Sequence, residues 1–189
     1  MPAWTLPIQL ILAGLLVGAL SAHAEDRKTL ASLPPEARDT ATTALQWTDQ
    51  YWDARAGMLW DTHVDPQFRP GEKRRHVVRD TIWYAVGLML RDQQGDRERS
   101  LQAIAAVLKQ QIDDPAQPYN GTFYRSAEDP HPPARYARLF VEYDPNWREF
   151  VGTTLAVLLE EYSDSALHIG ESRTFPVIEI VITLLRVIE

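Results

Sequence analysis

The sequence has 189 residues, a formal net charge of −7 at neutral pH and no cysteine. The acidic balance argues against nucleic acid as a partner, because binding to phosphates requires a basic surface. The absence of cysteine excludes a small disulfide scaffold, so the folded domain depends on its hydrophobic core.

Residues 1–24 are predicted to be a signal peptide. The apolar run from Leu6 to Leu20 is shorter than the roughly 20 residues that span a membrane. Ala22-His23-Ala24 follows it and has the small-x-small form of a signal-peptidase site. We expect cleavage before Glu25, a periplasmic or secreted protein, and no membrane attachment after cleavage. The alternative is that the segment stays uncleaved as a membrane anchor. The mature chain of about 165 residues is long enough for one domain.

The first predicted helix begins at Pro34-Pro35-Glu36, because proline and an acidic residue favour the first helical turn. Small and apolar residues then recur at helical spacing as far as Trp52, and Gly57 ends the pattern. Met58-Leu59-Trp60 is predicted to be a short, buried, extended segment.

Three further helices follow in chain order. Residues 76–91 are apolar on most sides, which is typical of a buried helix. A turn at Gly95 leads to residues 97–112, whose single apolar stripe indicates a surface helix. Residues 147–162 again predict a buried helix, which Ser163-Asp164-Ser165 is expected to end.

The alternation of one-sided and buried helices predicts an all-α fold of helical hairpins in two layers. We expect this domain to cover residues 25–165. Residues 166–189 form a separate apolar segment, predicted to be helical because it is too long for an ordinary strand. The long connections precede the two buried helices, so the loops are expected to gather at the N-terminal ends of those helices.

The longest connection, residues 113–146, is rich in aromatic and charged residues. A loop of this length is more often functional or disordered than incidental, and its aromatic content argues against disorder. Aromatic faces beside carboxylates and guanidinium groups suit a sugar ligand. They equally suit an ordered loop that only covers the core.

The stretch from Tyr51-Trp52-Asp53 through Gly57-Met58-Leu59-Trp60 resembles the first-helix pattern of the six-hairpin (α/α)6 toroid class. Residues 83–88, 121–125 and 143–149 are similar to uncharacterised secreted members of that class. The class contains many glycoside hydrolases and polysaccharide lyases. The resemblance implies a site in the funnel formed by loops at the N-termini of the inner helices. The chain has about five predicted helices, fewer than a complete toroid needs, so we expect a truncated reading frame and self-association through exposed inner helix faces.

Candidate catalytic residues are the acids at the loop-bearing end, Asp80, Asp144 and Glu149, because glycosidases use two carboxyl groups. Acids in a first helical turn also simply stabilise the helix dipole, and Asp144 or Asn146 suits an N-cap. A lyase needs a base and a cation for the substrate carboxylate, and His76 is a base of the right type. The candidate substrate-binding residues are Arg79, Tyr84, Tyr124, Arg125, Trp147 and Arg148. For the arginines, ion pairing with neighbouring acids is the alternative interpretation, and for the tryptophan it is burial in the core.

The five histidines show no zinc-ligand spacing, and the sequence has no glycine-rich phosphate loop. We therefore expect neither a metal nor a cofactor. The predicted function is that of a secreted or periplasmic carbohydrate-active protein, either a hydrolase or a lyase, with an oligosaccharide or polysaccharide ligand. The alternative is a non-catalytic helical interaction module, in which the same aromatic surface completes the hairpin layer.

Overall fold

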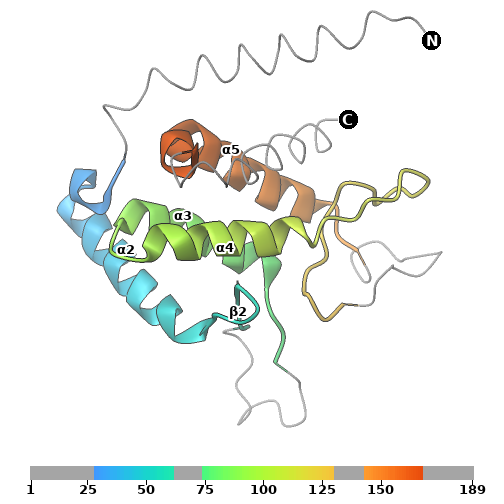
Figure 1. The fold of residues 1–189 in the computed structure, drawn as a ribbon, viewed down its shortest axis with the longest axis horizontal. Coiled ribbons are helices and arrows are strands. Elements are labelled where there is room, and N and C mark those ends of the chain that lie inside the picture. The colour runs from blue at the N-terminus through green and yellow to red at the C-terminus, as the bar shows by residue number, and fades with distance from the viewer. Residues whose placement is uncertain (1–27, 62–73, 130–142, 168–189) are drawn as a thin grey trace, which may run out of the picture.

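The computed structural model describes residues 28–61, 74–129 and 143–167, with side chains described as far as Tyr162. This part of the chain forms four α-helices and one two-stranded antiparallel sheet (Figure 1). The protein is thus mostly helical, as the sequence predicts. The predicted signal peptide lies outside the described residues, as does the apolar segment beyond Leu167.

Helix α2 (Pro35–Thr48) lies between two short 3-10 helices, η1 (Leu30–Ser32) and η2 (Asp49–Tyr51). Pro35 and Glu36 occupy its first turn, as the start signal predicts. Leu45 is the buried residue of this helix, and it packs so closely on α3 that a Cβ added to Gly87 would lie 2.5 Å from Leu45 Cδ2. Helix α2 therefore rests on its neighbour through a narrow contact and leaves most of its surface exposed.

Strands β1 (Trp52–Asp53) and β2 (Met58–Leu59) form a small hairpin, with Trp52 opposite Leu59 and Asp53 opposite Met58. Both residues of β2 are almost completely buried. The predicted buried, extended segment is confirmed. Gly57 precedes β2 with φ +69°, a backbone conformation that favours glycine.

Helix α3 (Val78–Arg91) is the central helix and contacts α2, α4 and α5 (Figure 1). Its apolar residues face several neighbours at once, which confirms the predicted buried helix. Asp92 and Gly95 adopt left-handed conformations in the tight turn to α4 (Asp96–Leu108). Helix α4 ends before the predicted residue 112, because Gln111 and Ile112 instead pair with the loop at Phe123 and Thr122.

Helix α5 (Asn146–Leu167) runs alongside α3. The predicted break at Ser163-Asp164-Ser165 is wrong, since the helix continues through these residues. Serine and aspartate cost a helix only a few tenths of a kcal/mol relative to better helix formers, too little to end a helix already formed. The main core lies between α3, α4 and α5 and includes Met58 and Phe123.

The described part of the long loop folds onto the starts of α3 and α5. The backbone N–H of Val78 donates to the Arg125 carbonyl over 3.1 Å, and the Thr122 hydroxyl donates to the Asp144 carbonyl over 3.1 Å. Tyr119 and Tyr143 pack together nearby. The loop thus gathers at the N-terminal ends of the two buried helices, as predicted. Residues 130–142 of the same loop lie outside the described part of the chain.

Candidate functional site

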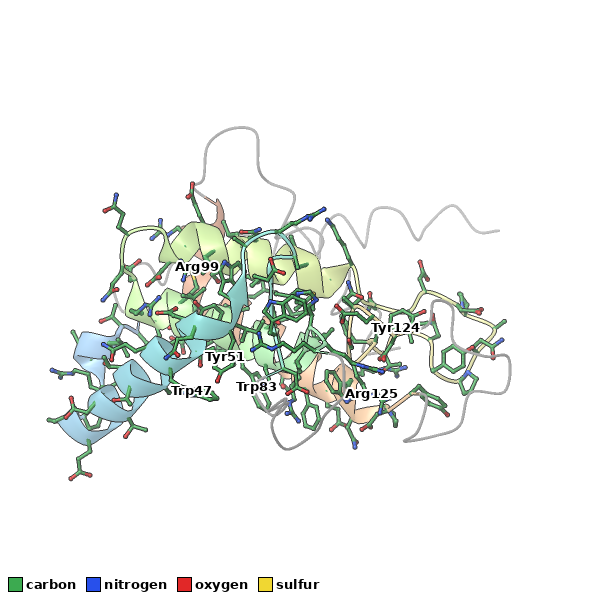
Figure 2. All side chains as sticks on the ribbon, turned by 90° about the horizontal axis from the view of Figure 1, so that it is seen from below. Trp47, Tyr51, Trp83, Arg99, Tyr124 and Arg125 are labelled. Atoms are coloured by element: carbon green, nitrogen blue, oxygen red, sulfur yellow. The ribbon has the colours of Figure 1, made fainter. Side chains whose placement is uncertain are left out.

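A groove of about 540 Å³ runs between α2 and α3. Trp47 of α2 and Trp83 of α3 line it, and their exposed fractions are 49% and 48%. Its remaining walls are mainly apolar and include Leu45, Leu59 and Leu90. Figure 2 shows Trp47, Tyr51 and Trp83 beside α2, whereas Tyr124 and Arg125 lie farther along the molecule on the loop. An apolar hollow with a few polar groups is the usual form of a ligand site.

Arg79 and Asp80 supply the charge of the groove. They lie in the first turn of α3, where the Arg79 Nε–H donates to Asp80 Oδ1 over 3.1 Å. The Arg79 guanidinium is 4.8 Å from the ring centre of Trp83, 5.7 Å from that of Trp147 and 5.8 Å from that of Phe150. These contacts fix the cation at the end of the groove where α3 and α5 begin.

The three predicted catalytic acids have different surroundings. Asp80 lines the groove, paired with Arg79. Asp144 accepts the backbone N–H of Asn146 over 2.9 Å through Oδ1, which forms an Asx turn immediately before α5. Glu149 is exposed on the first turn of α5. Asp144 and Glu149 are not among the described residues that line the groove. The structure thus brings one of the three acids into this site.

Two predicted binding residues at the start of α5 are tied into the fold. Trp147 is 8% exposed and belongs to the main core. Arg148 donates through Nη2 to the Asn120 carbonyl, and its buried Nε has no hydrogen-bond partner among the described residues. Arg148 therefore fastens the loop to α5, and Trp147 enters the site only through its contact with Arg79.

Tyr84 forms part of the groove wall, but its hydroxyl belongs to a separate ionic network. It donates to Asp49 Oδ1 and accepts from Arg99 Nη1 over 3.0 Å. Burial and the bond to Asp49 raise the pKa of Tyr84 to about 12, so the phenol stays protonated at neutral pH. The hydroxyl holds η2 against α3 and α4, which leaves the ring to face the groove.

Tyr124 and Arg125 lie on the loop and not in the groove. Tyr124 is buried beside Ile112 and Tyr119, and burial raises the pKa of its phenol. The backbone of Arg125 joins the loop to α3 through Val78 and to the Asp129 carboxylate. These two residues therefore hold the loop in place, which is the alternative that the sequence left open for this segment.

The sequence analysis missed Trp47 and did not place His76 with its partners. Trp47 lies away from the buried side of its helix. A large aromatic residue outside the predicted apolar stripe was the signal that could have identified it as a surface residue with a role in binding. His76 lies between Asp53 and Glu128, which are distant from it in sequence. Within the described ranges no group of three or more histidine, cysteine or acidic residues has the arrangement to hold a metal ion.

Together these features define a mostly helical domain with an aromatic, charged groove beside its central helix. The chain belongs to the family described as "Domain of unknown function (DUF8769)", whose model matches residues 38–173. The match begins within α2 and includes every later element as far as α5. No curated protein matches the chain, and no solved structure matches it. Within the described residues, no helix has both the length and the apolar character to cross a bilayer.

Proposed function

We propose that this protein is an exported carbohydrate-active protein that binds a saccharide in the groove between α2 and α3. The observation that carries the proposal is the pair of half-exposed indole rings, Trp47 and Trp83, that line one hollow. A large aromatic ring offers a rigid apolar face with a polar edge. Such a face suits the C–H surface of a sugar ring, whose hydroxyl groups remain free to meet polar side chains.

Arg79 and Asp80 provide those polar partners. The Nε of Arg79 is bonded to Asp80, and the guanidinium carries further N–H donors at its Nη atoms. The Asp80 carboxylate accepts hydrogen bonds through two oxygens. Donors and acceptors side by side match the hydroxyl groups of a sugar, each of which both donates and accepts. The aromatic contacts of Arg79 restrict its motion, which reduces the entropy lost on binding.

Binding is the step that we assign to this groove. Glycoside hydrolysis requires a second carboxyl group about 5–9.5 Å from the first, and Asp80 is the one acid among the described residues of the lining. A hydrolase or a lyase therefore needs a further group from elsewhere. The exported location rests on residues 1–24. The proposal of an (α/α) toroid type of fold is supported by the hairpin of α3 and α4 and by the packing of α5 alongside α3.

The test is ligand binding by the purified chain, followed by tryptophan fluorescence and thermal shift against a panel of neutral and acidic oligosaccharides. We expect at least one panel member to bind, and Trp47→Ala and Trp83→Ala each to weaken it about tenfold or more, which equals about 1.4 kcal/mol. Val157→Ala is the matched control, because Val157 is 43% exposed on α5 and outside this groove. Equal loss in the control, or no binding by the wild type, contradicts the proposal.

A second function, the non-catalytic interaction module, is favoured by one specific observation. A further hollow of about 310 Å³ between α3 and α5 is lined by Trp83, Val86, Thr153, Thr154 and Val157. Trp83 borders both hollows, so the apolar surface continues from α2 across α3 to α5. Continuous exposed apolar surface is typical of protein interfaces.

Self-association distinguishes this second function from the first. If the surface is an interface between copies of the chain, light scattering should show a dimer or larger species that Val157→Glu converts to monomer. In that case Val157→Glu should leave oligosaccharide binding unchanged. A wild-type chain that is monomeric at all tested concentrations removes self-association as the use of this surface.

A further inference from the structure

His76 joins three separate segments of the chain. It lies immediately before α3, it is 7% exposed, and its ring stacks on Trp60 with ring centres 3.8 Å apart. Its Nδ1 is 2.6 Å from Glu128 Oε1 on the loop, and its Nε2 is 3.3 Å from Asp53 Oδ2 at the end of β1. A single imidazole ring therefore contacts the β1–β2 hairpin on one side and the loop on the other.

The surrounding bonds determine which ring nitrogen carries the first proton. Glu128 Oε2 already accepts the backbone N–H of His76 over 2.9 Å and the Ser126 hydroxyl over 2.6 Å. The Glu128 carboxylate is thus fixed as an acceptor, and its short contact with Nδ1 requires a proton on Nδ1. Asp53 Oδ1 likewise accepts two backbone N–H groups, from Arg55 and Ala56.

The contact between Nε2 and Asp53 then depends on a second ring proton. A neutral imidazole has one N–H group and one lone pair. With the N–H directed to Glu128, the lone pair of Nε2 faces the Asp53 carboxylate, and two acceptors cannot bond to each other. Protonation of the ring converts Nε2 into a donor and makes the second bond.

We propose that His76 is a pH-dependent latch that fastens the β1–β2 hairpin to the start of α3 when its ring is protonated. Loss of that proton releases the Asp53 side of the latch and leaves the Glu128 side closed. Among the groups of the latch, the imidazole is the one whose charge changes most readily with pH, so the hairpin side of the latch responds to pH.

The other charged groups around the ring do not replace its two carboxylate partners. Arg75 pairs with Asp129 over 3.1 Å, and Arg74 lies over the rings of Tyr51 and Trp60, about 6 Å from their centres. Backbone N–H bonds from Ala56 and Arg55 lower the pKa of Asp53. Partial burial raises the pKa of Glu128, but bonds from Ser126 and His76 outweigh it, so the net shift is downward. Both carboxylates therefore stay ionised around neutral pH and remain acceptors for the ring.

The latch acts on one wall of the groove. Leu59 of the hairpin lines the groove, and its neighbour Trp60 stacks on His76. The expectation that pH changes ligand binding rests on the proposed function. The proposal of the latch does not rest on that function, because the opening of the latch is measured without any ligand.

Two adjacent backbone amides report the two sides of the latch separately. The Val77 N–H donates to the Leu59 carbonyl of the hairpin over 2.9 Å, and the Val78 N–H donates to the Arg125 carbonyl of the loop over 3.1 Å. Hydrogen exchange of both amides is followed by NMR from pH 5.5 to pH 8 and corrected for the intrinsic exchange rate. We expect the protection of Val77 to fall severalfold as pH rises, while the protection of Val78 stays constant.

Asp53→Asn supplies the decisive variant. The introduced side-chain amide keeps an oxygen that accepts the N–H groups of Arg55 and Ala56, and its N–H₂ group donates to the lone pair of a neutral Nε2. The pH dependence of Val77 protection should therefore reverse in Asp53→Asn and disappear in His76→Gln. If Val77 and Val78 change together in the wild type, or if Asp53→Asn behaves like the wild type, the latch is refuted. If His76→Gln does not fold, Asp53→Asn still decides the question.

Discussion

Replacing Arg91 by methionine should destabilise the protein by about 3–5 kcal/mol, because it leaves a buried carboxylate without its cation. The Arg91 side chain is 8% exposed and that of Asp96 is 5% exposed. Two parallel bonds of 2.8 and 2.7 Å join the Arg91 guanidinium to the Asp96 carboxylate. Two more, of 2.7 and 3.2 Å, join it to Asp49, the first residue of η2. One cation thus connects η2, which directly follows α2, with α3 and α4.

Arg97→Met is the matched control. Arg97 also pairs with an aspartate, Asp92, but over 3.7 Å and with side chains that are 38% and 39% exposed. Exposed pairs of this kind contribute about 0–1 kcal/mol. The two substitutions remove the same charge from the same region, and so they differ mainly in the burial of the pair.

Urea denaturation at pH 7 measures the loss of unfolding free energy in both variants. The comparison is valid when the slope of the unfolding free energy against urea concentration is the same in wild type and variants. The measurement should also be repeated in acid. Partial burial raises the pKa of Asp49, but bonds from Arg91 and Tyr84 outweigh it and lower the pKa overall. The stability that Asp49 contributes is therefore present above its ordinary value of 3.8 and is lost as pH falls through the lower folded value. The difference between wild type and Arg91→Met should shrink below about pH 4. A loss at pH 7 no greater than that of Arg97→Met refutes the reasoning.

Two further predictions concern contacts of α2 and η2 with α3. Leu45→Ala should cost about 2–5 kcal/mol in urea denaturation, and Gly87→Ala, which forces a Cβ to 2.5 Å from Leu45 Cδ2, should be less harmful in the Leu45→Ala background than in the wild type. If the two substitutions change the free energy of unfolding additively, the contact between Leu45 and position 87 is contradicted. Tyr84→Phe should cost about 1.5–3 kcal/mol, because it removes a bond to a charged group. The alkaline absorbance titration of the wild type should show one tyrosine ionising near pH 12 that is missing in Tyr84→Phe, and an unchanged titration curve would exclude Tyr84 as that group.

Much of the helical fold was predictable, because long apolar stretches with helical periodicity leave few alternatives. Helix α3 is apolar on most sides, and it lies at the centre of the fold. The predicted end of α4 was wrong because local and tertiary preferences compete there. Gln111 and Ile112 fit the periodic pattern of a helix, yet they pair with Thr122 and Phe123. No local signal in the sequence specifies that partner.

The candidate site was less predictable, because its parts come from separate elements. Arg79 and Asp80 were identified as polar groups in a first helical turn, and they do line the groove. Trp47 was not identified, since its importance depends on where α2 crosses α3. Asp53 and Glu128 lie 23 and 52 positions from His76, and neither spacing corresponds to a recognisable motif. Only the folded chain places both carboxylates on one imidazole ring.

The two indole rings of the groove are held differently, and this difference determines how the groove accepts a ligand. Trp83 is backed by the Arg79 guanidinium and contacts Phe150 of α5 edge-on, with ring centres 6.3 Å apart. Trp47 packs against Tyr51, one turn along the same polypeptide segment. Trp83 is therefore anchored by the neighbouring helix, whereas Trp47 depends on the position of α2. Because α2 packs on α3 through Leu45, the contact between Leu45 and Gly87 helps to set the width of the groove. Leu45 and Gly87 both line the groove, so sequence variation at either position adjusts the spacing of the two rings while it leaves the rings themselves unchanged.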